Sequence, residues 1–279
     1  MIAIADAGGT RTEWRFLNTS GADIEITQLN TGGFGYTESI DNYTEELERS
    51  ISHPDQVTEL YFYGAGLTGG PFYRSVKERF IELFTNAEIR LESDMLAAAR
   101  GLCGSQPGYV GVLGTGANFA HFDGQRIKRA IPPLGYILGD EGSGSYLGKI
   151  IVRDYLRGKL DEQLHSRLAR RIEGSEQEIL SRVYSPEGKS FLASLSRFIQ
   201  QNINHPYTYK LVYDSFTQFF DVFVRGNQLQ GTIHFTGSVA FYFSDILRQA
   251  GSDFGVSIGN IVETPIAGLT LFHEKDLLK

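Results

Sequence analysis

Short apolar runs alternate with segments of helical spacing along the first hundred residues. Runs rich in β-branched and aromatic residues predict strands, whereas apolar residues three and four positions apart predict helices. On this pattern we expect strands at residues 2–5, 13–16, 24–29, 60–63 and 89–92. Helices are expected at residues 39–52, 73–84 and 94–102.

The same order begins again after the polar stretch at residues 104–108. Strands are expected at 109–113 and 118–122, with a glycine turn between them, and Asp123-Gly124 favours a hairpin. Residues 143–227 have helical spacing, and 233–235 is a further strand before a helix that runs to residue 250. The pattern therefore indicates an α/β protein with mixed sheets flanked by helices and a helical insertion in its second half. We expect two domains, residues 1–106 and 107–279.

Two of the turns between expected strands are rich in glycine. They read Asp6-Ala7-Gly8-Gly9-Thr10-Arg11-Thr12 and Gly114-Thr115-Gly116-Ala117-Asn118. Glycine lets backbone N–H groups approach phosphate oxygens closely, and Asp6 at a strand end suits Mg²⁺ held through water. Each turn alone also fits an ordinary hairpin. Two of them in similar halves favour a phosphate chain gripped from both sides.

A third turn, Thr236-Gly237-Ser238, lies between a strand and a helix. This position suits a nucleoside, although Ser238 as a plain N-cap is the simpler interpretation. Asp94 also follows a strand and opens a helix. It is either a second N-cap or a carboxylate that accepts a proton from a substrate hydroxyl.

The densest group of glycines and acids is the stretch from Gly135 and Tyr136 to Ser145, with Asp140 and Glu141 at its centre. Acids are favourable near the start of a helix, so both could cap the helix that follows. The surrounding glycines favour close approach of a ligand, and paired carboxylates suit sugar hydroxyls.

Composition limits the partners that this chain is expected to bind. The net charge is −7, which argues against nucleic acid and against an anionic membrane surface. A single cysteine, Cys103, excludes an internal disulfide and a cysteine metal site. No apolar run approaches the ~20 residues of a membrane span, and the first residues do not resemble a signal peptide. We therefore expect a cytoplasmic protein.

Taken together, these segments resemble the N-acetylglucosamine kinase-like, BadF/BadG-type ATPases of the sugar kinase, Hsp70 and actin superfamily. The resemblance covers nearly the whole chain, because five segments occur in the family's order and spacing. The segments are Asp6–Thr12, Glu92–Asp94 with Ala97–Ala99, Gly114–Asn118, Pro133–Ser145 and Thr236–Asp245.

The resemblance implies a two-domain actin-like ATPase fold, also described as ribonuclease H-like, with an ATP cleft between the domains. It implies ATP and Mg²⁺, with Asp94 as the catalytic base and Thr10 and Thr115 at the phosphates. Gly237 and Ser238 would lie near adenosine. The sugar pocket would be lined by Asn118, Gly135, Tyr136, Asp140 and Glu141. A homodimer is plausible by the same analogy, and the last helix often packs on the first domain.

The expected reaction is phosphorylation of N-acetylglucosamine or a related amino sugar, at the 6-hydroxyl. Two departures from the family pattern concern the sugar: Gly35 stands where relatives often have Asn, and Ala117 where they often have Ser. A kinase for N-acetylmuramic acid or glucosamine is therefore one alternative, and a non-catalytic ATP-dependent sensor or assembly protein is another. The branch of the family with an iron–sulfur cluster is nearly excluded, because it needs more cysteines than Cys103.

Overall fold

The computed structural model describes residues 1–9, 11–20, 23–34, 40–225 and 231–277. The chain forms two compact units. Unit 1 comprises Met1–Pro107, Phe122–Ile127 and Thr264–Lys279, and unit 2 comprises Gly108–His121 and Lys128–Glu263. Each unit contains one five-stranded sheet, and the predicted α/β class with mixed sheets is confirmed.

The sheet of unit 1 has the strand order β3-β2-β1-β4-β5. Strands β1, β2 and β3 are antiparallel, whereas β4 and β5 run parallel to β1. Their bounds are β1 Ile2–Ala7, β2 Arg11–Ser20, β3 Asp23–Gly32, β4 Glu59–Gly64 and β5 Glu88–Ser93. All five were expected from the alternation of apolar residues, with ends that differ by a few positions.

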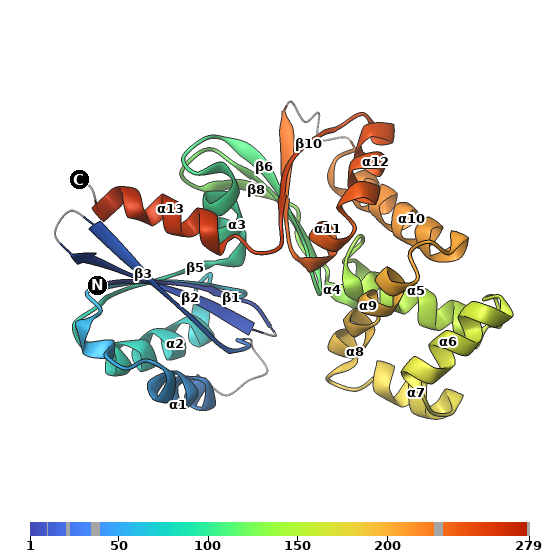
Figure 1. Ribbon diagram of the computed structural model, residues 1–279, viewed down its shortest axis with the longest axis horizontal. Helices are drawn as coiled ribbons and strands as arrows, with labels where there is room; N and C mark the ends of the chain where they lie inside the picture. The colour runs from blue at the N-terminus through green and yellow to red at the C-terminus, as the bar shows by residue number, and fades with distance from the viewer. Residues whose placement is uncertain (10, 21–22, 35–39, 226–230, 278–279) are drawn as a thin grey trace. The chain divides into compact units, whose positions relative to one another are not determined.

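Helices cover both faces of this first sheet (Figure 1). One face carries α1 (Ile40–Ser50) and α2 (Gly70–Leu83), and the other carries α3 (Asp94–Cys103) and α13 (Ile266–Leu277). A short 3₁₀ helix, η1 (Pro54–Gln56), precedes β4. Aromatic side chains fill the core on the α1 and α2 side, where the rings of Phe34, Phe62 and Phe80 pack edge to face.

The sheet of unit 2 has the order β10-β9-β6-β7-β8, so each strand has a counterpart in unit 1. This agreement supports the internal repeat seen in the sequence. The bounds are β6 Gly108–Leu113, β7 Ala117–Phe122, β8 Ile127–Ala130, β9 Thr232–Thr236 and β10 Ser257–Val262. Strand β10 was not expected, and β8 was implied only by the predicted hairpin at Asp123-Gly124. Gly259 and Asn260 interrupt the apolar pattern of β10, and its register with β9 shifts between Ile258 and Ile261.

Residues 144–223 are helical apart from short connections, as predicted. A cluster of buried leucine, isoleucine and phenylalanine side chains joins these helices to the second sheet. The helices of unit 2 are α4 Gly135–Leu138, α5 Gly144–Leu156, α6 Glu162–Ile172, α7 Glu176–Val183, α8 Gly188–Ser194, α9 Ser196–Gln201, α10 Pro206–Phe223, α11 Ser238–Tyr242 and α12 Ser244–Phe254. Within the described ranges, no helix combines the length and apolar character needed to cross a membrane.

Candidate active site

The first glycine turn and Asp94 belong to the same edge of the sheet in unit 1. Strands β1, β4 and β5 are parallel, and their register places Asp6 beside Tyr63, and Tyr63 beside Glu92. Since parallel strands end at one edge, Asp6 and Asp94 come together there, Asp6 near the end of β1 and Asp94 directly after β5.

The turn itself joins β1 to β2 and is open to solvent. The Gly8 N–H donates to the Arg11 carbonyl over 3.0 Å, and both Gly8 and Gly9 are exposed. The guanidinium of Arg11 forms an ion pair with Glu13. Thr10, which was expected at the phosphates, lies outside the described residues, as does Gly35.

Asp94 is not the N-cap of α3. That position belongs to Ser93, whose Oγ accepts the Leu96 N–H over 3.2 Å. Asp94 is the first residue of the helix, and its Oδ1 accepts the N–H of Met95 over 2.9 Å. Ser93 and Asp94 thus each accept one N–H of the first turn of α3, and the role of Asp94 as a base stays a prediction.

Asp6 lies in an acidic environment. Burial, with the nearby charges of Glu13 and Asp94, raises the pKa of Asp6 from its ordinary value of 3.8 to about 7, although Arg11 acts in the opposite direction. Glu13 faces Asp6 across the strand pair β1–β2 and also accepts a hydrogen bond from Thr264 Oγ1 over 3.1 Å. A cation at this edge would relieve the repulsion among these carboxylates.

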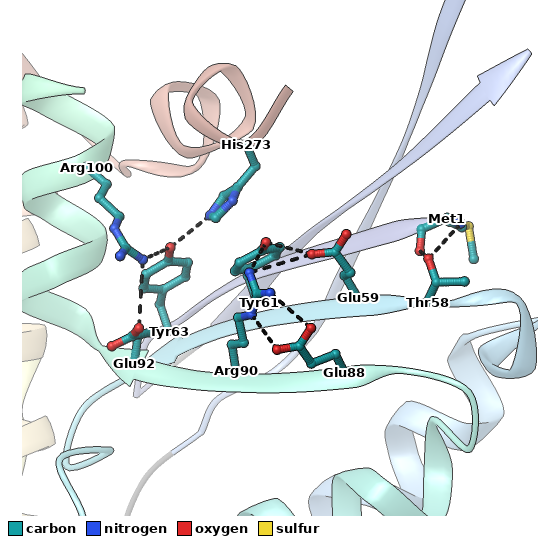
Figure 2. A network of polar contacts seen from close by, with 10 residues as sticks. All are labelled: Met1, Thr58, Glu59, Tyr61, Tyr63, Glu88, Arg90, Glu92, Arg100 and His273. Carbon is teal, nitrogen blue, oxygen red and sulfur yellow. Dashed lines mark hydrogen bonds and ion pairs between the residues drawn. The ribbon is translucent and has the colours of Figure 1, made fainter. Parts of the chain in front are cut away.

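Helix α13 packs closely against α3. A Cβ on Gly268 would lie 1.9 Å from the Gly101 carbonyl oxygen, so only glycine permits this approach of the two backbones. Figure 2 shows the polar contacts that accompany it: Arg100 donates to Tyr63 Oη over 2.8 Å, and that oxygen lies 2.8 Å from His273 Nε2. These contacts fix the helix that begins with Asp94.

In unit 2, three segments that are far apart in the sequence meet at one place. Gly114 N–H donates to Gly116 O within the second glycine turn, over 3.0 Å. From the start of α5, Gly144 N–H donates to Gly114 O over 2.8 Å, and Ser145 N–H donates to Thr115 O over 3.2 Å. The third turn joins them, because a Cβ on Gly237 would lie 2.4 Å from the Leu113 carbonyl oxygen.

The loop between α4 and α5, which contains Asp140 and Glu141 and is called the acidic loop below, does not provide the N-cap of α5. Ser143 is the N-cap, with its Oγ accepting the Tyr146 N–H over 3.1 Å. Asp140 is only 4% exposed, and its φ of 59° lies in the left-handed region that side chains rarely occupy. Its Oδ2 lies 3.2 Å from Lys189 Nζ. Glu141 is partly exposed beside it.

The remaining residues of the expected sugar pocket also lie in unit 2. Asn118 is the second residue of β7, and its Oδ1 accepts the N–H of Phe119 over 2.8 Å. Gly135 and Tyr136 open α4, and the Tyr136 carbonyl accepts a hydrogen bond from Lys149 Nζ over 2.9 Å. Burial lowers the pKa of Lys149, with Glu141 and Asp140 acting in the opposite direction.

An open pocket of about 400 Å³ lies beside the third turn. Its volume falls in the range of about 300–1,000 Å³ that is common for small-molecule sites. Ser238 is the first residue of α11 and not its N-cap, which is Gly237. Helix α9 forms the opposite wall. The lining residues are Ser196, Arg197, Gln200, Ser238, Val239, Tyr242 and Phe243.

Several polar residues at these places were missed in the sequence. Glu13 was assigned only to a strand, while Lys189, Arg197 and Gln200 were treated as part of the helical insertion. No local sequence motif identifies Lys189, Arg197 or Gln200, because helix packing brings them to Asp140 and to the pocket beside Ser238. Glu13 could have been found, since it stands opposite Asp6 once the first hairpin is drawn in register.

Among the residues that the structure describes, no group of three or more His, Cys, Asp or Glu side chains is arranged to enclose a metal ion. Mg²⁺ commonly binds one or two carboxylates together with phosphates and water. Asp6, a strand-end carboxylate near Glu13 and Asp94, fits a magnesium ion that is held mainly by nucleotide and water, because such an ion would offset this local negative charge.

Replacement of Asp6 by Asn is expected to change how stability depends on pH. The folded chain holds the Asp6 proton up to about pH 7, whereas the unfolded chain releases it near 3.8, so this stabilisation is complete below pH 3.8 and is lost as pH rises through 7. Asn has no proton to lose. Relative to the parent chain, Asp6→Asn should therefore gain about 3–4 kcal/mol of unfolding free energy between pH 4 and pH 8.

Urea unfolding at both pH values measures this difference. Asp55→Asn, at an exposed carboxylate, is the control for removing one negative charge. An equal effect of Asp6→Asn at both pH values would contradict the raised pKa.

Comparison with known proteins places the chain in a family. No protein-family model and no curated protein matches it. Among solved structures, a predicted N-acetylglucosamine kinase from Porphyromonas gingivalis is 33% identical, with a TM-score of 0.91 over 99% of this chain and 100% of that one.

Two more distant structures share the fold. A predicted N-acetylglucosamine kinase from Chromobacterium violaceum is 18% identical, with a TM-score of 0.69 over 97% of this chain and 98% of that one. A ROK family glucokinase from Streptomyces griseus, in complex with glucose and AMPPNP, is 15% identical, with a TM-score of 0.56 over 98% of each chain. The chain belongs to the N-acetylglucosamine kinase-like ATPases and has their actin-like ATPase fold.

Proposed function

We propose that this chain is an ATP-dependent carbohydrate kinase that phosphorylates N-acetylglucosamine or a related amino sugar at its 6-hydroxyl. The observation that carries the proposal is the 33% identity, over essentially the whole chain, with a predicted N-acetylglucosamine kinase. The grouping of the predicted segments within each unit supports it. A cytoplasmic location and a homodimer remain predictions.

Asp94 is the base in this proposal. The sugar hydroxyl oxygen forms a bond to the γ-phosphorus of ATP, and the bond from that phosphorus to the β,γ-bridging oxygen breaks, which releases ADP. The hydroxyl proton passes to the Asp94 carboxylate. The position of Asp94 at the start of α3, beside Asp6, supports this role, because α3 is already capped by Ser93.

The glycine turns are proposed to bind the nucleotide. Backbone N–H groups at Gly8, Gly9, Gly114 and Gly116, with Arg11, Thr10 and Thr115, would contact its phosphates, and Gly237 with Ser238 would lie at the adenosine. The pocket beside Ser238 supports the nucleoside assignment. Mg²⁺, held by Asp6 through water, would supply charge neutralisation on the phosphates.

The sugar is proposed to lie against the acidic loop of unit 2. Asn118, Gly135 and Tyr136 would contact it, with Asp140 and Glu141 accepting hydrogen bonds from its hydroxyl groups. The burial of Asp140 beside Lys189 supports a role other than surface charge, because an ionised carboxylate is costly to bury and this one is kept inside the loop with a cationic partner.

Asp94→Asn should lower the rate of sugar phosphorylation by about 10²–10⁴-fold, because the variant has no carboxylate to accept the proton. Nucleotide binding should be kept. Steady-state kinetics and calorimetry with an ATP analogue measure the two effects. Glu162→Gln is a matched control, since Glu162 is also the first residue of a helix. Near-normal turnover by Asp94→Asn would remove this residue from the mechanism.

Sugar-stimulated ADP release across a panel of sugars tests the substrate. We expect the highest kcat/KM with N-acetylglucosamine, and lower values with N-acetylmuramic acid, glucosamine and glucose. A preference for N-acetylmuramic acid or glucosamine would support the alternative kinases. A chain that binds ATP and responds to no sugar would instead be a sensor or an assembly protein, and the kinase proposal would be wrong.

Ser238→Tyr should raise the KM for ATP by about tenfold or more and leave the sugar KM unchanged, because a phenol ring would occupy the pocket. Ser252→Tyr, on the exposed surface of α12, provides the same substitution away from the pocket. An unchanged KM for ATP in Ser238→Tyr would show that the nucleoside binds elsewhere.

A further inference from the structure

Lys189 contacts the acidic loop from the helical insertion. It is the second residue of α8, and its Nζ lies 3.2 Å from Asp140 Oδ2. The Lys189 side chain is 40% exposed, whereas that of Asp140 is 3% exposed. The pair therefore joins a buried carboxylate to an ammonium group that is still in contact with solvent.

The backbone of α8 is placed by close contact with α5. A Cβ on Gly148 would lie 2.0 Å from the Leu192 carbonyl oxygen, and a Cβ on Gly144 would lie 3.3 Å from that of Ala193. Gly188, directly before Lys189, is packed with a similar closeness against Val183, where a Cβ would lie 2.0 Å from the carbonyl oxygen. Because α5 begins just after the acidic loop, this packing sets where the lysine meets the loop.

The pair also touches the second glycine turn. The point where a Cβ on Gly116 would stand is 2.9 Å from Lys189 Nζ and 3.0 Å from Asp140 Oδ2. The ammonium, the carboxylate and the turn thus share one small volume. Lys149, the other lysine near the loop, donates to the Tyr136 carbonyl.

We propose that Lys189 is a positioning residue for the sugar: its ammonium compensates the buried Asp140 carboxylate and orients it to accept hydrogen bonds from substrate hydroxyl groups. The inference rests on the proposed function, which places Asp140 at the sugar. A buried carboxylate that loses the ammonium group beside it is left with less compensation and reorients, which removes the acceptor from the site.

Lys189→Met tests the inference through the separate kinetic constants. The KM for the sugar should rise by about tenfold or more, while the KM for ATP and kcat change by less than about threefold, since the lost interaction binds substrate and transition state alike. Lys189→Arg should return the sugar KM to within about threefold of the parent value. Lys210→Met is the control, because it removes an exposed lysine that is paired with Asp214 at 2.8 Å.

A sugar KM that is unchanged in Lys189→Met, in an active and folded protein, would overturn this inference and leave the proposed function standing. No phosphorylation of any sugar by the parent chain would instead overturn the proposed function, and this inference with it. A kcat that falls while the sugar KM stays constant would also contradict positioning of the sugar.

Should Lys189→Met be too unstable for kinetic measurement, the double variant Lys189→Met/Asp140→Asn is expected to be more stable than the single variant, because it no longer buries a charge without a partner. Thermal unfolding of the four proteins in this cycle measures the coupling between the two side chains. Independent, additive effects of the two substitutions on stability would overturn the pairing.

Discussion

Contact between backbones at glycine determines where the functional groups of this protein lie. Gly268 meets the carbonyl of Gly101, Gly148 meets that of Leu192, and Gly237 meets that of Leu113. At each point a Cβ would overlap the facing carbonyl, so the approach exists only without a side chain. Close-packed interiors transmit small displacements. These contacts therefore control where α3, α5 and the second glycine turn lie, and with them the predicted site residues that these elements carry.

The predicted site carboxylates of the two units have neighbours of opposite charge. In unit 1, two neighbouring carboxylates, Asp94 and Glu13 across the hairpin, both disfavour the ionised form of Asp6. Such an arrangement is receptive to a cation. In unit 2, Asp140 has a lysine beside it, and a compensated carboxylate is suited to neutral hydroxyl groups. Under the proposed function, local charge balance would distinguish the phosphates with their metal from the sugar, in a chain whose net charge is −7.

Much of the fold could be predicted because its signals are local. The apolar runs of β1 to β5 and the glycine turns are visible in a few consecutive residues, and the sequence alone places Asp94 at a strand end. The sequence left open whether Asp94 and the pair Asp140 and Glu141 cap the helices that follow them, since an acid and a serine side by side both satisfy the pattern; the N-caps are Ser93 and Ser143. Lys189 could not be found, because it reaches Asp140 only through the packing of α8 on α5.

The division of the chain has a consequence for its synthesis. Unit 1 takes its last helix, α13, from the segment that follows the whole of unit 2. A nascent chain emerges from the ribosome N-terminus first and usually folds its domains in that order. Here the part of the first sheet that α13 covers stays exposed until α13, Ile266–Leu277, has been translated. Unit 2 can be complete before unit 1, and apolar surface left exposed on the first sheet in that interval is the kind that aggregates or is bound by chaperones.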